Sequence, residues 1–273
     1  MDFVPDYKVA QKQIRQSGIL NAYPFGTYSN AYIVTNEDLR KSMRFVPKNC
    51  ENALVVAASG DHPLFCSLSG AKHVDTFDIS YNAKCIMDIK VAALNSLNYS
   101  EYGDFLDGLY MRRYNLHPIT DINKMDEILY RLPKIESDYI HFLKDEGLFV
   151  CGPRPSTAGV LPTFMEYEKL RKTITQPYNF ILSNIVNLST SLTKSYDFIH
   201  LSNIFDYLIE NDFKKLLLSI MKFVNPGGRI VMEAFEDDIC FYLDFIGPKI
   251  VSMSDNRFVM KKMQRIHVFE RIK

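Results

Sequence analysis

The stretch NALVVAASGDHPLFCSLSGAKHVDTFDIS, residues 52–80, decides the fold of this chain. Its apolar run at 53–58 is typical of a strand that is buried on both faces of a sheet. A turn of small residues with Gly60 follows, then a short helical segment over 61–70 and a second strand over 73–79. Strand, tight turn, helix and strand in this order predict the first crossover of a doubly wound α/β sheet.

Strands and helices continue to alternate along the rest of the chain, on either side of a long helical stretch. A helix is predicted over 80–97, with Ser80 as its N-cap. Beyond the helical stretch, a helix over 210–224, a turn at 225–228 and a strand at 229–235 follow further strand-like segments. The tail offers one or two extended segments that suit an antiparallel edge. The predicted fold class is therefore α/β, a Rossmann-like doubly wound, mostly parallel sheet.

We expect an N-terminal helical segment over residues 1–50 and a Rossmann-like domain over 51–273. Thr35 or Asn36 is the predicted N-cap of a helix within the N-terminal segment. The Tyr-rich stretch at about 100–178 has helical patterns and no clear buried strand, so it is predicted to be a helical insertion or cap.

Composition restricts the class of protein. The chain has 273 residues, 47% of them apolar, and its 32 basic residues balance 32 acidic ones. The net charge thus gives no sign of a nucleic-acid partner. Its 5 cysteines are far apart and form no Cys-x-x-Cys pair, which favours buried thiols in a reducing cytosol over disulfides or a zinc site. With no apolar run long enough to span a bilayer, we expect a cytoplasmic protein without stable membrane insertion.

The first turn indicates the class of ligand. Gly60 can adopt the positive φ that a sharp turn requires, and Asp78 is placed to accept hydrogen bonds from both hydroxyls of a ribose. The G-x-G-x-x-G pattern of pyrophosphate sites is absent, and Asp61 puts a negative charge near the helix start. A carboxylate there disfavours a diphosphate but tolerates a sulfonium. These features favour S-adenosylmethionine (AdoMet) over NAD as the cofactor.

Two longer segments carry a resemblance to known families. YDFIHLSNIFDYL at 196–208, followed by a helix and NPGGRIVME at 225–233, is similar to the fourth and fifth strands of class I AdoMet-dependent methyltransferases. VVAASGDHPLFCSLSGAKHVDTFDIS, with DIKVAALNSLNYSEYGDFLDG at 88–108, resembles the BtaA-like family. Members of that family transfer the 3-amino-3-carboxypropyl group of AdoMet to diacylglycerol. The chain departs from the methyltransferase pattern at its first strand, where Val55 or Val56 replaces an acid, for which Asp61 is the candidate substitute.

This resemblance implies a set of cofactor-binding residues: the turn at Ser59, Gly60 and Asp61 under the methionine part, Asp78 on the ribose with Ile79 beside the adenine, Asn184 and Ile185 on the base, Ser202 and Asn203 beneath the sulfonium, and Tyr28 and Asn30 closing the site. Structural alternatives exist for several of them: Asp78 as a helix N-cap, Asn203 as a partner of loop backbone, and Tyr28 as a packed aromatic. The candidates for a catalytic base are Asp206, Tyr207 and Glu233, and no metal site is predicted.

The predicted function is transfer of the aminocarboxypropyl group of AdoMet to a small-molecule or lipid acceptor. Methyl transfer from AdoMet is the first alternative, and non-catalytic AdoMet binding is the second. An NAD-dependent oxidoreductase is disfavoured by the glycine count of the turn.

Overall fold

The structure is a computed structural model, and it describes residues 3–16, 26–29, 33–35, 37–110, 124–146, 161–233, 249–253, 256–263 and 266–272. Two compact units are present, each formed by several chain segments. Unit 1 contains residues 1–36, 57–64 and 78–178, and unit 2 contains residues 37–56, 65–77 and 179–273. Within the described residues, no helix is both long and apolar enough to cross a membrane.

The helices are α1 (Tyr7–Gln16), α2 (Leu39–Ser42), α3 (Asp61–Leu68), α4 (Tyr81–Ser96), α5 (Tyr99–Tyr110), α6 (Met125–Leu129), α7 (Lys134–Asp145), α8 (Phe164–Thr173) and α9 (Glu210–Ile220), with short 3-10 helices at Met43–Phe45 (η1), Ile185–Thr190 (η2), Ile204–Tyr207 (η3) and Met221–Phe223 (η4). The strands are β1 (Asn52–Val56), β2 (His73–Asp78), β3 (Asn179–Leu182), β4 (Tyr196–His200), β5 (Val224–Glu233), β6 (Lys249–Met253), β7 (Asn256–Met263) and β8 (Ile266–Arg271).

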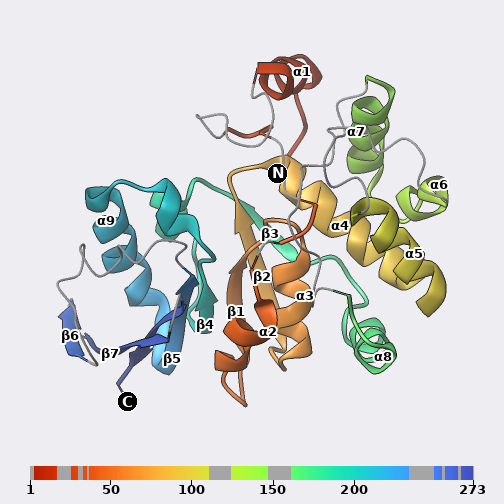
Figure 1. The fold of residues 1–273 in the computed structure, drawn as a ribbon. Helices are drawn as coiled ribbons and strands as arrows, with labels where there is room; N and C mark the ends of the chain where they lie inside the picture. The colour runs from red at the N-terminus through yellow and green to blue at the C-terminus, as the bar shows by residue number, and fades with distance from the viewer. Residues whose placement is uncertain are drawn as a thin grey trace. The chain divides into compact units, whose positions relative to one another are not determined.

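Unit 2 is built around an eight-stranded sheet with the order β3-β2-β1-β4-β5-β8-β7-β6 (Figure 1). β1 runs parallel to both β2 and β4, and β4 runs parallel to β5. The strand order reverses between β1 and β4, which is the switch point of a doubly wound sheet, and ligands bind outside the carboxyl ends of the strands at such a point. The predicted Rossmann-like fold class is confirmed.

The core strands are apolar because both of their faces are covered. Leu54 and Val55 of β1, Ile199 of β4 and Ile230 of β5 are all fully buried. This explains why the run at 53–58 lacks the polar alternation of a half-exposed strand.

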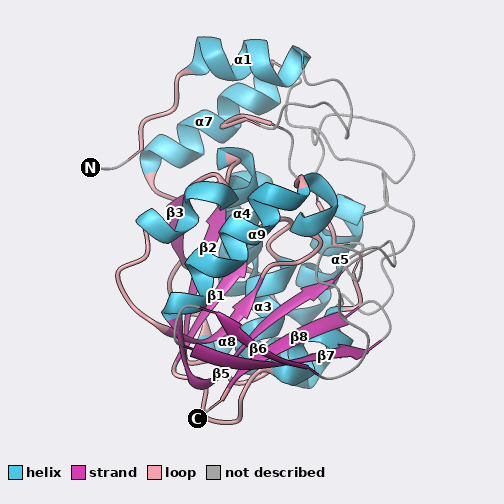
Figure 2. Cartoon of the chain, turned by 90° about the vertical axis from the view of Figure 1, so that its left-hand side faces the viewer, coloured by secondary structure: helices cyan, strands magenta, loops and turns pink. Residues whose placement is uncertain are grey.

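The carboxyl-terminal edge of the sheet is antiparallel, as predicted, but it has three strands rather than one or two. β8 pairs with β5, β7 with β8 and β6 with β7, each antiparallel (Figure 2).

The predicted turn at 225–228 is wrong in one respect, because these residues lie within β5 as a bulge. Between Tyr196 and Phe198, β4 advances two residues, whereas its partner β5 advances from Val224 to Arg229. Gly228 is required there, since a Cβ would lie 2.9 Å from the Asn225 carbonyl oxygen.

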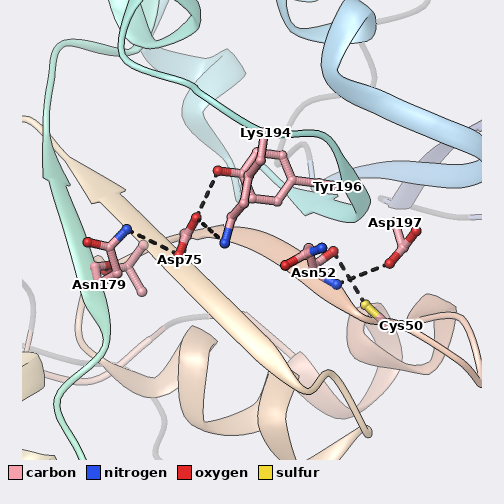
Figure 3. Close-up of polar contacts among 8 residues, drawn as sticks. Cys50, Asn52, Asp75, Asn179, Lys194, Tyr196 and Asp197 are labelled. Carbon is pink, nitrogen blue, oxygen red and sulfur yellow. Dashed lines mark hydrogen bonds and ion pairs between the residues drawn. The ribbon is translucent and has the colours of Figure 1, made fainter.

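Hydrogen-bonded carboxylates fix the register of the sheet in unit 2 (Figure 3). Asp75 of β2 accepts hydrogen bonds from Asn179 Nδ2 at 3.1 Å and from the Tyr196 hydroxyl at 2.9 Å, and it pairs with Lys194 at 3.0 Å. These contacts join β2 to β3, to β4 and to the segment that precedes β4. The Asp75 carboxylate thus makes its hydrogen bonds to groups of the protein itself, where they hold these segments together.

Unit 1 consists of helices, in which α4 contacts α5, α6 and α8, and α1 contacts α7 (Figure 1). Ser80 is the N-cap of α4, as predicted, and its side chain accepts a hydrogen bond from the Asn82 amide. In unit 2, by contrast, the N-cap of α2 is Asp38, so the predicted cap at Thr35 or Asn36 is wrong. The stretch predicted as a helical insertion does supply α5 to α8.

Candidate functional site

The turn after β1 has a backbone that few residues can adopt. Gly60 has φ +80° and Ala58 has φ +45°, and the Gly60 amide donates to the Ala57 carbonyl at 2.7 Å. A Cβ on Gly60 would lie 2.7 Å from the Met87 Cα of α4, closer than real Cβ atoms approach backbone. The predicted need for glycine at this position therefore has two causes, its conformation and its packing against α4.

Asp78 lies at the end of β2, and its carboxylate is tied to the turn. Its Oδ2 accepts a hydrogen bond from the Ala58 amide at 3.0 Å, and its Oδ1 accepts one from the Ser80 amide at 2.9 Å. Desolvation raises the pKa of Asp78 to about 6, against the opposing effect of these amides. The N-cap of α4 is Ser80, which removes the cap alternative for Asp78.

An ionised carboxylate has about four lone-pair positions, so two amide donors leave capacity for further hydrogen bonds. Asp78 is only partly buried, and at neutral pH it is mostly ionised. It can therefore accept from a pair of neighbouring hydroxyl groups.

The negative charge that the sequence places at the helix start, on Asp61, is compensated by a buried cation. Its Oδ1 pairs with Lys90 Nζ at 2.6 Å, and both side chains are almost fully buried. Its Oδ2 accepts hydrogen bonds from the Ser59 hydroxyl at 2.8 Å and from the Thr35 amide at 2.9 Å. The charge of Asp61 is thus neutralised inside unit 1, and the electrostatic argument against a phosphate no longer rests on it.

Lys90 was not singled out in the sequence because it lies 29 residues beyond Asp61, within the apolar pattern of α4. Its Nζ also donates to the Ile33 carbonyl oxygen at 2.7 Å. The pair therefore anchors residues 33–35 beside the turn.

Tyr28 is buried and packed within unit 1. Its hydroxyl accepts a hydrogen bond from the Asp6 amide at 2.7 Å, and its ring lies against those of Phe3 and Tyr139. These contacts match the packed-aromatic alternative, so a ligand contact by its side chain stays a prediction. Asn30 lies outside the described residues. Ile79, next to Asp78, is partly buried.

In unit 2, Asn184 is exposed and serves as the N-cap of η2, where its side chain accepts a hydrogen bond from the Val186 amide. Ile185, the first residue of η2, is partly buried. Their predicted contacts with an adenine base stay predictions.

Ser202 and Asn203 follow β4, and the structure brings them together with two buried glutamates. Glu37 Oε1 accepts hydrogen bonds from the Ser202 hydroxyl and from the Asn203 amide, the latter at 3.1 Å. The Glu233 amide donates to the Ser202 carbonyl oxygen at 2.9 Å. Ser202 itself has φ +56°, which is rare for a residue with a side chain. The Asn203 side-chain oxygen lies 3.2 Å from the Ser202 hydroxyl oxygen, and its predicted contact with the cofactor stays a prediction.

Glu37 could not be predicted as a site residue, because the sequence pattern around it indicates the start of a helix. No local pattern reports a contact between residues that are 165 positions apart. Of the predicted catalytic residues, Glu233 is placed at this cluster, and Tyr207 lies in η3 and is partly buried. The backbone of Asp206 also lies in η3, and its side chain lies outside the described part of the structure.

No protein-family model matches the chain, and no curated protein matches it. Several solved structures are similar in fold. N-methyltransferase NodS from Bradyrhizobium japonicum WM9, in complex with S-adenosyl-l-homocysteine, aligns over 98% of this chain and 98% of its own, with 8% identity and a TM-score of 0.42.

The rRNA methyltransferase aviRa from Streptomyces viridochromogenes aligns over 89% of this chain and 88% of its own, with 9% identity and a TM-score of 0.42. For SMU.1697c, a putative methyltransferase from Streptococcus mutans in complex with SAH, the shares are 88% and 100%, with 9% identity and a TM-score of 0.41. Similarities this low carry no argument about function, which has to be inferred from the residues of this chain.

Proposed function

We propose that this chain is an AdoMet-dependent transferase of the class I methyltransferase-like superfamily. The observation that carries the proposal is Asp78, a carboxylate at the end of β2 that is hydrogen-bonded to the turn after β1. In a doubly wound sheet, an acid at this position binds the ribose of an adenosine cofactor. Charge-assisted hydrogen bonds from the two ribose hydroxyls would hold the sugar.

The turn itself supports a cofactor without a pyrophosphate. A pyrophosphate is bound by several backbone amides that point at it. Here the Ala58 amide already donates to Asp78, and the Gly60 amide donates to Ala57. Ser59 is fully buried, with its hydroxyl on Asp61. The amides of Ala58 and Gly60 are thus engaged within the protein, which favours AdoMet over NAD.

AdoMet is its own electrophile, since the sulfonium sulfur is the leaving group whichever carbon is attacked. The resemblance to the BtaA-like family supports transfer of the 3-amino-3-carboxypropyl group, with methyl transfer as the alternative. Positioning of the acceptor supplies much of the rate enhancement in either case. The predicted cofactor contacts of Ser59, Gly60, Asp61, Ile79 and the residues of unit 2 form part of this proposal.

Calorimetric titration with AdoMet tests the cofactor assignment. Asp78→Ala removes at least one charge-assisted hydrogen bond, worth about 1.5–3 kcal/mol, and should weaken binding by about 10-fold or more. The matched control is Asp75→Asn on the same strand, whose contacts lie within the sheet. It should lower stability and leave AdoMet affinity unchanged. Equal affinities of wild type and Asp78→Ala would refute the proposal.

The by-product identifies the group that is transferred. Incubation with AdoMet and a panel of acceptors yields methylthioadenosine when the aminocarboxypropyl group moves, and S-adenosylhomocysteine when the methyl group moves. Tight binding with neither product would identify a non-catalytic AdoMet-binding protein. Thermal stabilisation by NAD but not by AdoMet would favour the oxidoreductase instead.

A further inference from the structure

The start of α4 binds a segment from much earlier in the chain. Ser80, the N-cap of this helix, donates its hydroxyl hydrogen to the Ser29 carbonyl oxygen at 2.6 Å. The amide of Tyr81, which has no carbonyl partner within the helix, donates to the Thr27 carbonyl oxygen at 2.8 Å. Both segments belong to unit 1. We refer to residues 27–29 as the docked segment.

Asn82, the second residue of α4, adds three hydrogen bonds to this contact. Its Nδ2 donates to the carbonyl oxygens of Tyr28 and Ser29, each at 3.1 Å. Its Oδ1 accepts a hydrogen bond from the Tyr139 hydroxyl of α7 at 2.9 Å. The reversed amide would bring Oδ1 against two carbonyl oxygens, so the partners themselves define the orientation of this side chain. An amide, with donors on one atom and an acceptor on the other, is the group that these partners require.

These hydrogen bonds lie in the interior of unit 1. Asn82 and Ser29 are each 5% exposed, and Tyr139 is fully buried. Water cannot readily replace a partner that is lost there, so a carbonyl oxygen without its donor would be costly. The Tyr28 amide also donates to Gln13 Oε1 of α1 at 3.2 Å, and α1 contacts α7 (Figure 2). The docked segment thus joins α1 and α7 to the start of α4.

Ser80 links the docked segment to the carboxylate of Asp78. The Ser80 amide donates to Asp78 Oδ1 at 2.9 Å, while the Ser80 hydroxyl is held by the Ser29 carbonyl oxygen. The other oxygen of the carboxylate accepts a hydrogen bond from the Ala58 amide of the turn after β1 at 3.0 Å. The direction of the Asp78 carboxylate thus depends on two supports, the turn and the docked segment. A binding group has to be held to within about 0.5 Å, so a shift of either support would weaken its contacts with a ligand.

We propose that Asn82 is a positioning residue of the AdoMet site. Its side chain holds the docked segment on α4, the docked segment holds Ser80, and Ser80 directs the Asp78 carboxylate to the ribose. This inference rests on the proposed transferase function, and it attributes part of the cofactor affinity to hydrogen bonds that act through Asp78. It also gives α7 a role, because the Tyr139 hydroxyl fixes the Asn82 amide. A helix of the predicted insertion thus contributes to cofactor binding.

A double-mutant cycle, measured by calorimetric titration with AdoMet, tests this route. Asn82→Ala should weaken AdoMet binding about fivefold, a coupling typical of residues in one hydrogen-bond network. In the Asp78→Ala background it should have no further effect, since the carboxylate that Asn82 positions is gone. A purely structural role of Asn82 would instead weaken binding by the same factor in both backgrounds, and that result would overturn the inference.

Two buried tyrosines provide a matched pair of variants. The Tyr139 hydroxyl binds Asn82 at the start of α4. The Tyr167 hydroxyl donates at 2.6 Å to the carbonyl oxygen of Leu97, the C-cap of the same helix. Tyr139→Phe and Tyr167→Phe each remove a buried hydrogen bond, so both should lower the midpoint of urea unfolding. Only Tyr139→Phe should weaken AdoMet binding, by about threefold. Equal AdoMet affinities of these two variants would contradict the proposed role.

Hydrogen exchange of the wild type gives a test that needs no variant. If the contacts of the docked segment raise AdoMet affinity, AdoMet must stabilise these contacts in return. We expect AdoMet to slow exchange of the Ser29 and Tyr81 amides more than exchange of the Leu97 amide. The Leu97 amide donates to the Ala93 carbonyl oxygen at 2.9 Å, at the other end of α4. Equal protection at both ends of α4 would refute the coupling even if Asn82→Ala does not fold.

The same titrations separate this inference from the proposed function. A wild type that binds AdoMet, with an affinity that Asn82→Ala and Tyr139→Phe leave unchanged, would refute the positioning role and leave the transferase proposal standing. A wild type without affinity for AdoMet would refute the transferase proposal and, with it, the inference that rests on it.

Discussion

Replacing Gly60 by alanine is the most direct test of the turn after β1. The backbone at Gly60 has φ +80°, and a Cβ would lie 2.7 Å from Met87 Cα and 3.3 Å from Met87 Cβ. The left-handed conformation costs a residue with a side chain about 1–2 kcal/mol. Overlap with the backbone of α4 adds about 1–3 kcal/mol, since a close-packed site relaxes only in part. We therefore expect Gly60→Ala to lower the free energy of unfolding by about 2–5 kcal/mol.

Two other glycines separate these contributions. Gly70 has φ +104°, but a Cβ on this residue would meet no atom within 4 Å, so Gly70→Ala should show the conformational cost alone, about 1–2 kcal/mol. Gly103 lies inside α5 with open space around it, so Gly103→Ala should stabilise the protein by up to about 1 kcal/mol.

Urea-induced unfolding, followed by circular dichroism, measures all three variants. The difference between Gly60→Ala and Gly70→Ala gives the overlap with α4. A Gly60→Ala variant no less stable than Gly70→Ala would show that the turn does not pack against α4 as described. Gly60→Ala should also weaken AdoMet binding, because it displaces the turn from Asp78.

Three further outcomes are expected. Lys90→Met should destabilise the protein by about 3–5 kcal/mol in urea unfolding, since it leaves Asp61 as a buried charge without its cation, and adding Asp61→Asn should recover part of the loss. In calorimetry, AdoMet affinity should be constant above about pH 7 and fall by up to about tenfold per pH unit below pH 6, because protonation removes the negative charge of Asp78. Asp78→Ala should abolish this pH dependence. Burial and Asp88 raise the pKa of Glu136 from 4.5 to about 8. The stability that its bound proton contributes is therefore present below the pKa of the unfolded state and is lost as the pH rises through about 8. Glu136→Gln should flatten this part of the plot of unfolding free energy against pH. An unchanged slope in Glu136→Gln would contradict that assignment.

Local patterns were sufficient to predict the framework of the chain. The apolar run of β1, the glycine of the turn and the Ser80 cap each depend on neighbours in the sequence, and all are found in the structure. Local patterns led to a wrong prediction where the same residues suit two different backbone structures. The residues at 225–228 suit a turn, but strand pairing on both sides makes them a bulge within β5.

Contacts between distant segments account for what the sequence did not predict. Lys90 neutralises Asp61, and Glu37 meets Ser202, although nothing in the local sequence around either residue indicates its partner. Both are charged side chains that the chain can bury only with a suitable partner. Asp78 could be predicted at a strand end, where topology fixes its location, whereas charges whose environment depends on tertiary packing could not be predicted.

The bulge in β5 has a consequence for Glu233, which lies further along the same strand. Residues that pair across parallel strands have their side chains on the same face, so the pairing beyond the bulge fixes the face on which each later side chain lies. β5 takes five steps where β4 takes two, and regular pairing resumes at Arg229, four residues before Glu233. A deletion that shifted this pairing by one residue would remove no functional group, yet it would turn the carboxylate at 233 toward the other side. The length of this segment is thus as much a part of the chemistry as the acid itself.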